Sequence, residues 1–231
     1  MNVERFESFI ATRKTVRRFQ PTTVPVELLD RLCAISQRAP SAYNLQPTHY
    51  YITTQRQKKE ALLAAAMGQQ QVISAPVVIA FAGDMNVVAS QSKKIFDMDQ
   101  KQGSLTEKQI ETYRLALEMN FSSKPLGFGK IAKAIFGPFL RLFTPLPELP
   151  VVHKRAWVYK QVSLTAMTFL LAAHSAGLAT CLMEWFDERR VKKTLQIPRQ
   201  CAVPLIVAVG YPDEDPTLKS RLPLNEVRHW V

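Results

Sequence analysis

A basic run near the amino end carries residue types suited to binding an anion. In RKTVRRF, an extended backbone alternates its side chains between two faces, so Arg13, Thr15 and Arg17 are expected to share one face. Two guanidinium groups that flank a hydroxyl suit a phosphate monoester, because arginine contacts phosphate oxygens bidentately and threonine donates one more hydrogen bond. Solvated basic segments show the same pattern. The run is therefore a phosphate-binding candidate that other segments have to support.

A polar hinge, PSAYNLQP, joins an apolar helical pattern to an aromatic run. Ser41, Asn44 and Gln46 offer uncharged donors and acceptors, which a polyhydroxyl chain or a heterocyclic amide edge requires for recognition. The alternative is an Asx-type loop that closes the helix, with Pro40 and Pro47 as helix breakers. Both interpretations stay open at this point.

Further candidates stand at the end of a strand pattern and near the carboxyl end. Glu184 ends an apolar strand pattern, where loops commonly form binding sites, and Trp185 follows it. Lys219 and Arg221 are far from the basic run in sequence but can reach the same site in space. A lone glutamate is more often a cap or an ion-pair partner, and late cations are often surface charges. Only the fold can bring these residues together.

No arrangement for nucleophilic catalysis or metal binding is apparent. The three cysteines contain no CxxC pair, so neither a disulfide framework nor a zinc site is expected. We find no Ser/His/Asp or Cys/His arrangement and interpret the histidines as structural or surface residues. No GxGxxG motif follows a strand, and the GFGK at residues 127–130 lacks a strand–turn–helix context, so a dedicated dinucleotide fold is not expected.

Alternating helices and strands are predicted to position these candidates. Periodicity and capping patterns predict helices near residues 6–10, 25–33, 58–67 and 106–120, a helix rich in Arg and Lys that Asp187 caps, and a buried central helix over 154–177. Strands are predicted over 49–54, 76–83, 178–184 and 203–212. This order predicts an α+β fold with a small central sheet, in one domain spanning residues 1–231. Prolines and glycines concentrated at about 122–153 indicate an insertion or lid.

The charge balance favours anionic partners without choosing among them. Thirty Lys and Arg residues against 19 Asp and Glu residues give a formal net charge of +11. Lys130, Lys133 and Arg141 lie among aromatic residues, so a basic module that associates with membranes or nucleic acid is a minor alternative. The amino end lacks the apolar core of a signal peptide, and no apolar run reaches the ~20 residues of a membrane span. We expect a cytoplasmic protein with no membrane span.

Four separated segments together resemble the FMN-dependent nitroreductase family: RKTVRRF, PSAYNLQP, the helix and strand from Trp157 through CLMEWFD, and KSRLP. The resemblance covers about residues 5–83 and 154–225. It implies a nitroreductase-like α+β fold, with a small mixed or antiparallel central sheet flanked by helices. It also implies an interlocked homodimer with two FMN molecules in clefts across the interface.

The resemblance assigns roles to matching positions. Arg13, Lys14 and Thr15 match the start of the phosphate and ribityl motif, and Arg17 matches its second cation. The hinge matches the loop that packs on the flavin from the opposite subunit. The backbone amide of Glu184 is similar to the one that faces the flavin N5 atom. The full set of implied cofactor-binding residues is Arg13, Lys14, Thr15, Arg17, Pro40, Ser41, Asn44, Gln46, Gln70, Leu182, Met183, Glu184, Lys219 and Arg221.

This chain departs from the family pattern at three places. Thr48 stands where relatives often have an aromatic residue, and Trp185 stands where close relatives have a glycine. Three glutamines, Gln69, Gln70 and Gln71, occupy a region where some members place an asparagine and a lysine, and Gln70 is the candidate for a flavin contact. We expect the first two departures to reshape the substrate cavity.

The implied reaction is hydride transfer from NADH or NADPH through bound FMN to a nitroaromatic, quinone or similar electron-poor acceptor, with ping-pong kinetics. No catalytic side chain or metal is expected, because the flavin N5 atom carries the hydride and fixed cations or donors stabilise the reduced ring. A specialised flavin enzyme on the same fold, a reductive dehalogenase or a flavin destructase, is the alternative. The acceptor, the choice of nicotinamide and the role of the insertion stay open.

Overall fold

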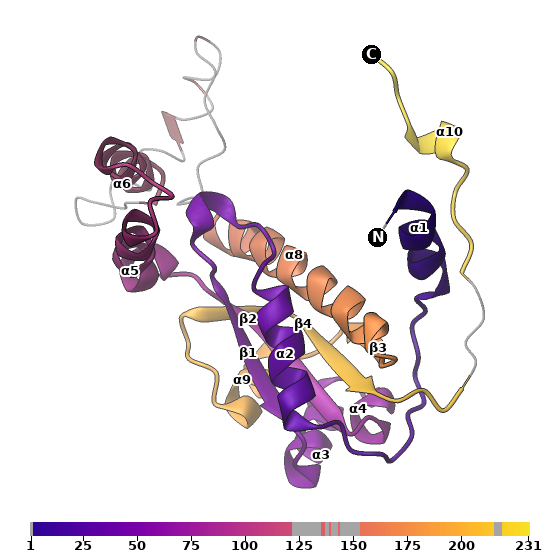
Figure 1. Ribbon diagram of the computed structural model, residues 1–231. Helices are drawn as coiled ribbons and strands as arrows, with labels where there is room; N and C mark the ends of the chain where they lie inside the picture. The colour runs from indigo at the N-terminus through magenta and orange to yellow at the C-terminus, as the bar shows by residue number, and fades with distance from the viewer. Residues whose placement is uncertain (1, 122–134, 137–138, 140–142, 144–152, 215–218) are drawn as a thin grey trace.

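A four-stranded sheet forms the centre of the fold. The computed structural model describes residues 2–121, 135–136, 139, 143, 153–214 and 219–231 (Figure 1). Its strands are β1 (Thr48–Thr53), β2 (Val77–Asp84), β3 (Ala179–Met183) and β4 (Cys201–Gly210), in the spatial order β1-β2-β4-β3. All three pairings are antiparallel. The two central strands, β2 and β4, are buried along almost their whole length, which explains why their sequences are nearly continuous apolar runs.

Two long helices cover one face of the sheet. The central helix α8 (Lys154–Ser175) packs on β2 and β4, and α2 (Val26–Ser36) packs beside it. The ring of Phe169 meets Phe81 edge-on, with 5.4 Å between the centroids. Gly83 permits this close approach, because a Cβ there would lie 2.2 Å from the Val158 Cγ1 atom. The core therefore forms where α8 contacts β2.

Shorter helices cover the opposite face. These are α3 (Arg56–Ala65), α4 (Gln71–Ser74) and α9 (Glu188–Leu195), which bury a second apolar cluster against the sheet. The carboxylate of Asp187 caps α9 by accepting hydrogen bonds from the amides of Arg189 and Arg190. This cap matches the sequence prediction.

Two further helices, α5 (Val87–Lys101) and α6 (Glu107–Phe121), pack against each other at one end of the sheet. A capping box begins α6: the Thr106 hydroxyl accepts from the Gln109 amide, and the Gln109 side chain accepts from the Thr106 amide. The sequence predicted α6 and its cap, but it did not predict α5.

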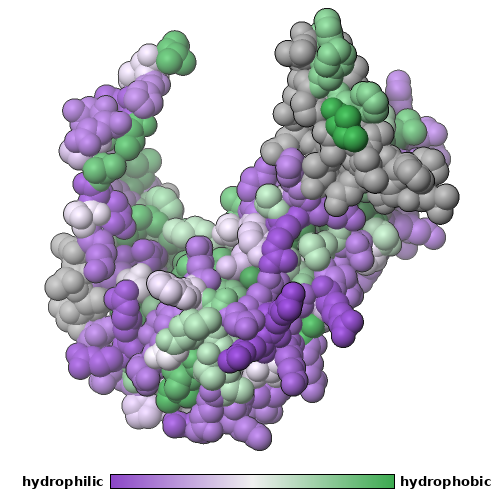
Figure 2. Space-filling model, turned by 180° about the vertical axis from the view of Figure 1, so that it is seen from behind, coloured by the Kyte–Doolittle hydropathy of each residue, from purple (hydrophilic) through white to green (hydrophobic). Residues whose placement is uncertain are grey.

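The two ends of the chain lie next to each other, away from the sheet. Helix α1 (Val3–Thr12) and a carboxyl-terminal arm that includes α10 (Leu224–Val227) rise side by side (Figure 1). An isolated bridge between Phe19 and Pro212 joins the segments at their base. Figure 2 shows a deep hollow between this pair of segments and the far end of the molecule.

The structure confirms the predicted α+β class with its small central sheet, and it resolves the sheet as antiparallel. The predicted insertion or lid at about 122–153, including the basic residues Lys130, Lys133 and Arg141, lies almost wholly outside the described residues. Among the helices that the structure describes, none is long and apolar enough to cross a membrane.

A partly buried tyrosine, Tyr50, makes the stability of this fold depend on pH in the alkaline range. Burial raises the pKa of Tyr50 to about 12 from its usual value near 10, and its hydroxyl lies 2.7 Å from the Ser36 hydroxyl. The folded state holds this proton more tightly than the unfolded state, so the contribution is complete below pH 10 and is lost as the pH rises towards 12. Tyr50→Phe removes the titrating hydroxyl, so the unfolding free energy is expected to fall less between pH 9 and 11.5 than in the native protein. The expected difference is on the order of 1 kcal/mol; it is this small because the ring is only partly buried. Urea unfolding at both pH values measures this, and an equal fall in both proteins would contradict it.

Candidate functional site

The basic run and the carboxyl-terminal cations line one cavity of about 610 Å³. One wall is the side of α1, the second is the segment directly after it, and the third is the start of the carboxyl-terminal arm. The lining residues are Phe6, Glu7, Ile10, Ala11, Arg13, Lys14, Thr15, Lys219 and Arg221. The fold thus brings Lys219 and Arg221 to the beginning of the basic run, across about two hundred residues of sequence. We call this the cationic cavity.

Backbone contacts hold the basic run in place. Helix α1 ends at Thr12, and the chain continues in an extended conformation at Arg13. The Val16 amide donates to the Thr180 carbonyl at 3.2 Å, and Thr15 forms a parallel bridge with Thr180. The segment therefore runs alongside β3 in the same direction, so the cationic cavity is fixed to the edge of the sheet.

A carboxylate clamps the other end of the basic run. Glu214 accepts hydrogen bonds from the amides of Arg17 and Arg18, at 2.6 and 3.2 Å, and pairs with the Arg18 guanidinium at 3.3 Å. The hydrogen bond from the Arg17 amide, followed by those from Arg18, lowers the pKa of Glu214. Sequence reasoning missed this clamp, since nothing local links residues 17 and 214.

Helix α1 contributes little to the core, and a histidine of α8 contacts it. No residue of α1 is buried. The His174 ring lies against Phe9 with 4.8 Å between centroids, and its Nε2 atom is 3.0 Å from the Thr12 hydroxyl. The sequence identified His174 only as a structural or surface residue. Its position shows that it anchors the wall of the cationic cavity.

The charge of the cationic cavity is strongly unbalanced. Arg13, Lys14, Lys219 and Arg221 supply four positive charges, and Glu7 supplies the one carboxylate among the described lining residues. Phe6 and Ile10 add an apolar side. Several cations converging on one cavity favour a dianionic group such as a phosphate monoester over a monocarboxylate.

Arg17 is placed differently from the other residues of the basic run. It does not line the cationic cavity, and its charge instead lowers the pKa of Cys181, which burial raises more strongly. The regular alternation that placed Arg17 beside Arg13 requires a continuous strand, whereas this segment makes one isolated bridge. The role of Arg17 as a flavin-binding cation stays a prediction.

The end of β3 presents the second set of candidates. Leu182 is partly exposed, Met183 is buried, and Glu184 follows the last strand residue on the surface. Trp185 comes next and is 77% exposed. The Gln69 side chain donates to the Trp185 carbonyl at 2.8 Å and so fixes the backbone beside Glu184.

The three glutamines have distinct positions. Gln71 is buried and donates to the Gln69 side chain at 3.0 Å, which supports the contact of Gln69 with the loop after β3. Gln70 is exposed and donates only to the nearby Gly68 carbonyl, at 3.3 Å. Gln69 is therefore the glutamine that contacts the loop after β3, and the flavin contact of Gln70 stays a prediction.

The polar hinge adopts an unusual backbone. Tyr43, Asn44 and Gln46 all have positive φ, between 47° and 54°, although none is glycine. The buried side chain of Leu45 and a hydrogen bond from the Ala42 amide to the Gln161 side chain, at 2.8 Å, hold this conformation. Left-handed residues cost free energy and accumulate at functional sites. The strain of the hinge is therefore consistent with a binding role rather than a plain helix end.

Within one chain the hinge and the cationic cavity are separate. Ser41 and Gln46 line a small cavity of about 180 Å³ with Thr48 and Thr165, and this cavity shares no residue with the cationic one. Pro40 precedes Ser41 at the surface of the same loop. If both groups bind one ligand, a second copy of the chain has to supply one of them.

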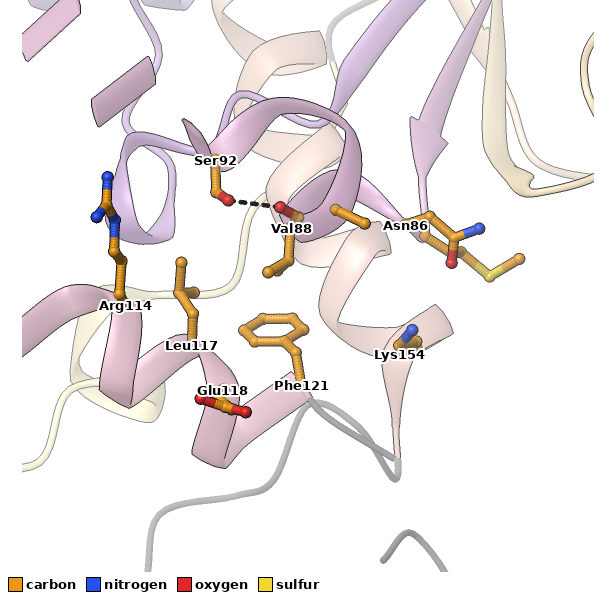
Figure 3. A pocket seen from close by; sticks show the side chains of 10 residues that line it. Asn86, Val88, Ser92, Arg114, Leu117, Glu118, Phe121 and Lys154 are labelled. Atoms are coloured by element: carbon orange, nitrogen blue, oxygen red, sulfur yellow. Dashed lines mark hydrogen bonds between the residues drawn. The ribbon is translucent and has the colours of Figure 1, made fainter. Parts of the chain in front are cut away.

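Another cavity, of about 370 Å³, lies between α5, α6 and the start of α8. Figure 3 shows Phe121 and Val88 facing its interior, with Arg114 and Lys154 on opposite sides. It contains none of the residues predicted to bind the cofactor.

The side chains show neither a reactive thiol nor a metal site. Burial raises the pKa of Cys33 to about 11 and also raises the pKa of Cys181 and Cys201, so all three stay protonated near neutral pH. No group of three or more potential metal ligands occurs in the part of the chain that the structure describes.

The fold and the cationic cavity define an α+β protein suited to a phosphate-bearing ligand. The chain belongs to the Nitroreductase family, whose model matches residues 10–211. It is 30% identical over 218 residues to an NADH dehydrogenase from Thermus thermophilus, covering 94% of this chain and 92% of that protein. Membership confirms the family predicted from the sequence.

Two other proteins mark the range of this similarity. An iodotyrosine deiodinase from Thermotoga neapolitana is 26% identical over 93% of this chain and 91% of its own length. A structure described as a nitroreductase in complex with FMN, from Exiguobacterium sibiricum, covers 98% of this chain and 97% of its own, with 18% identity and a TM-score of 0.75. The second similarity confirms the fold class.

Proposed function

We propose that this chain binds FMN and uses it to reduce nitroaromatic, quinone or similar electron-poor acceptors with hydride from NADH or NADPH. Family membership supports the NAD(P)H-dependent oxidoreductase class, and the FMN complex among similar structures supports the cofactor. The observation that carries the proposal is the convergence of Arg13, Lys14, Lys219 and Arg221 on one cavity.

The cationic cavity is the proposed phosphate end of the site. Arginine provides a rigid bidentate fork and lysine a mobile point charge, so the four cations can surround a phosphate from several directions. Thr15 adds a hydroxyl donor, and its position is fixed by the bridge to Thr180. These residues bind and orient the cofactor.

The end of β3 is the proposed ring end. Thr15 lies beside Thr180, and Glu184, four residues after Thr180, directly follows β3. At the rise of a strand, the backbone of Thr180 and that of Glu184 are about 13 Å apart. A phosphate joined to a ring through an extended ribityl chain fits a span of this order. The backbone amide of Glu184, fixed by the contact between Gln69 and Trp185, is then positioned at the ring.

A second copy of the chain completes the site in this proposal. Helix α8 is apolar nearly all round, a pattern typical of helices buried on every side. Leu164 and Met167 nevertheless remain 45% and 44% exposed on its outer side. A twofold dimer that covers this side would let the hinge of one subunit reach the cationic cavity of the other.

The chemistry requires little from the side chains. Bound FMN supplies the hydride transfer, taking electrons from NADH or NADPH and passing them to the acceptor, and the two substrates bind in turn. The chain supplies cations and backbone donors that favour the added negative charge. Trp185 offers a broad aromatic surface next to the ring end, on which a flat, electron-poor acceptor can stack.

The absorbance spectrum of the purified protein tests this function. We expect flavin bands on the protein as purified, or after incubation with FMN and removal of the unbound FMN, and we expect NADH or NADPH to bleach these bands without oxygen. Adding a quinone or a nitroaromatic compound should restore the bands. Protein that carries no flavin bands after incubation with excess FMN and removal of the unbound FMN would refute the proposal, and bands that neither nucleotide bleaches would refute the choice of electron donor.

Reductive dehalogenation is the second candidate, because an iodotyrosine deiodinase is similar along nearly its whole length. The two functions share the cofactor and differ in the acceptor. Iodide release from 3-iodotyrosine by the reduced protein, at a rate above that of quinone reduction, would favour this candidate. Reduction of quinones without iodide release would exclude it.

A further inference from the structure

A second concentration of positive charge lies around α9, away from the cationic cavity. A cavity of about 920 Å³ forms where the start of α8, the helix α9 and the turn after α9 meet. We call it the basic groove. Its lining residues are Arg155, Glu188, Arg189, Lys192, Lys193, Gln196, Ile197, Pro198 and Arg199. Five cations therefore face one carboxylate.

Two of these cations have structural partners and build the walls. Arg155 forms an ion pair with Glu188, whose other oxygen accepts a hydrogen bond from the Val203 amide at 3.0 Å. The Lys192 ammonium donates to the carbonyls of Arg199 and Cys201, at 2.9 and 2.6 Å. These contacts fix α8, α9 and the following turn relative to one another.

The other three cations have no such role. Arg189, Lys193 and Arg199 are exposed, and their side chains have no hydrogen-bond or ion-pair partner among the described residues. Burial lowers the pKa of Lys192; Cys201 opposes this shift, and repulsion from Arg155 adds a smaller lowering effect. The groove thus holds preformed positive charge that no group of the described chain neutralises.

The spacing of the free cations suits linked phosphates. Arg189 and Lys193 are four residues apart on one helix, so they share a face and lie about 6 Å apart along the axis. Gln196 ends the helix with φ of 56°, and the chain then turns to bring Arg199 to the same cavity. Cations spread over such a distance can contact neighbouring groups of an oligophosphate.

The composition of the groove distinguishes among anionic ligands. None of its described lining residues is aromatic, so it lacks the stacking surfaces that single-stranded nucleic acid requires. Its volume lies in the range of small-molecule sites. Helix α9 also lies away from α1 and α10 (Figure 1), so the groove is distinct from the cationic cavity.

We propose that the basic groove is a second anion site, which binds the di- or triphosphate group of a small molecule. This inference is independent of the flavin site. It accounts for positive charge, within the net +11, that the proposed cofactor does not use.

Calorimetric titration with inorganic tripolyphosphate tests the proposal. In FMN-saturated protein we expect one tripolyphosphate per chain, with affinity that falls as salt rises. Replacing all three free cations, Arg189→Gln, Lys193→Gln and Arg199→Gln, should weaken binding at least about tenfold, since charge-assisted hydrogen bonds are lost. A control with the same loss of charge replaces Lys94, Lys101 and Lys108, which are exposed on α5 and α6, with glutamine and should keep the affinity.

Other outcomes would overturn the proposal. Absence of binding to the native protein would refute the site, and equal weakening in both triple variants would show that only net charge matters. Loss of tripolyphosphate binding in Arg13→Ala, with retention in the groove variant, would place the anion in the cationic cavity instead. If duplex DNA binds more tightly than tripolyphosphate at equal phosphate concentration, the groove is a nucleic-acid site and not a site for a small-molecule di- or triphosphate. If the triple variant is misfolded by circular dichroism, Lys193→Gln alone is the test.

Discussion

Arg13→Ala is expected to weaken FMN binding by about ten- to a hundred-fold. Arg13 lines the cationic cavity with Lys14, Lys219 and Arg221, and its removal deletes a charge-assisted hydrogen bond to the phosphate worth about 1.5–3 kcal/mol. Fluorescence titration of the apoprotein with FMN measures the change. Riboflavin, which lacks the phosphate, should bind the variant and the native protein with similar affinity.

A matched substitution separates this effect from net charge. Arg31→Ala removes the same group from an exposed position on α2 and should leave the FMN affinity unchanged. Unaltered FMN binding by Arg13→Ala would remove this residue from the phosphate site. An equal loss for riboflavin would show that the substitution disturbs the fold rather than a phosphate contact.

The second large effect is expected on the outer side of α8. Leu164→Glu combined with Met167→Glu should weaken the dimer at least about a hundred-fold and remove tight FMN binding with it. Burying an apolar side chain of this kind in the interface stabilises the dimer by about 1.5–3 kcal/mol. Each substitution is present in both subunits of a twofold dimer, so its effect occurs twice. Sedimentation velocity over a range of concentrations measures the association, and absorbance measures the FMN retained.

Ile52→Glu is the control for this pair, because it places a glutamate on a comparably exposed apolar residue of the edge strand β1. It should leave both association and FMN content intact. A double α8 variant that still sediments as a dimer would exclude this surface as the interface. A monomeric variant that keeps tight FMN would refute the shared site.

Much of the fold could be predicted because its strongest signals are local. The apolar runs of β2 and β4 and the all-round apolar pattern of α8 reflect burial that each segment experiences along its whole length. Helix α5 was missed because polar residues such as Ser90, Gln91 and Ser92 interrupt its apolar spacing. Its Ile95 and Phe96 are buried in the core of the folded chain, where α5 packs on α6. In such segments, tertiary contacts rather than the local sequence pattern determine whether a helix forms.

The candidate site was predictable in its residue types but not in its geometry. Arg13, Lys14, Thr15, Lys219 and Arg221 were identified together only through the family resemblance, and the fold brings them to one cavity. The clamp by Glu214, the anchor at His174 and the contact of Gln69 with Trp185 join distant residues that no local pattern links.

The hinge illustrates the same limit. Its sequence indicates a loop, but the left-handed conformations of Tyr43, Asn44 and Gln46 follow from the burial of Leu45 and the hydrogen bond to Gln161. The basic groove is similar, because Arg155 and Arg199 meet α9 only in the folded chain.

A mixed dimer tests the shared site most directly. One subunit carries Arg13→Ala, and its partner carries Asn44→Gly, a change that removes the side chain but permits the positive φ of 52°. If each FMN contacts Arg13 from one subunit and Asn44 from the other, the mixed dimer contains one intact site. It should bind one FMN with native affinity and a second one weakly, while neither parent homodimer has a native site. A mixed dimer in which both sites are as weak as in the parents would contradict a flavin held between two copies of this chain.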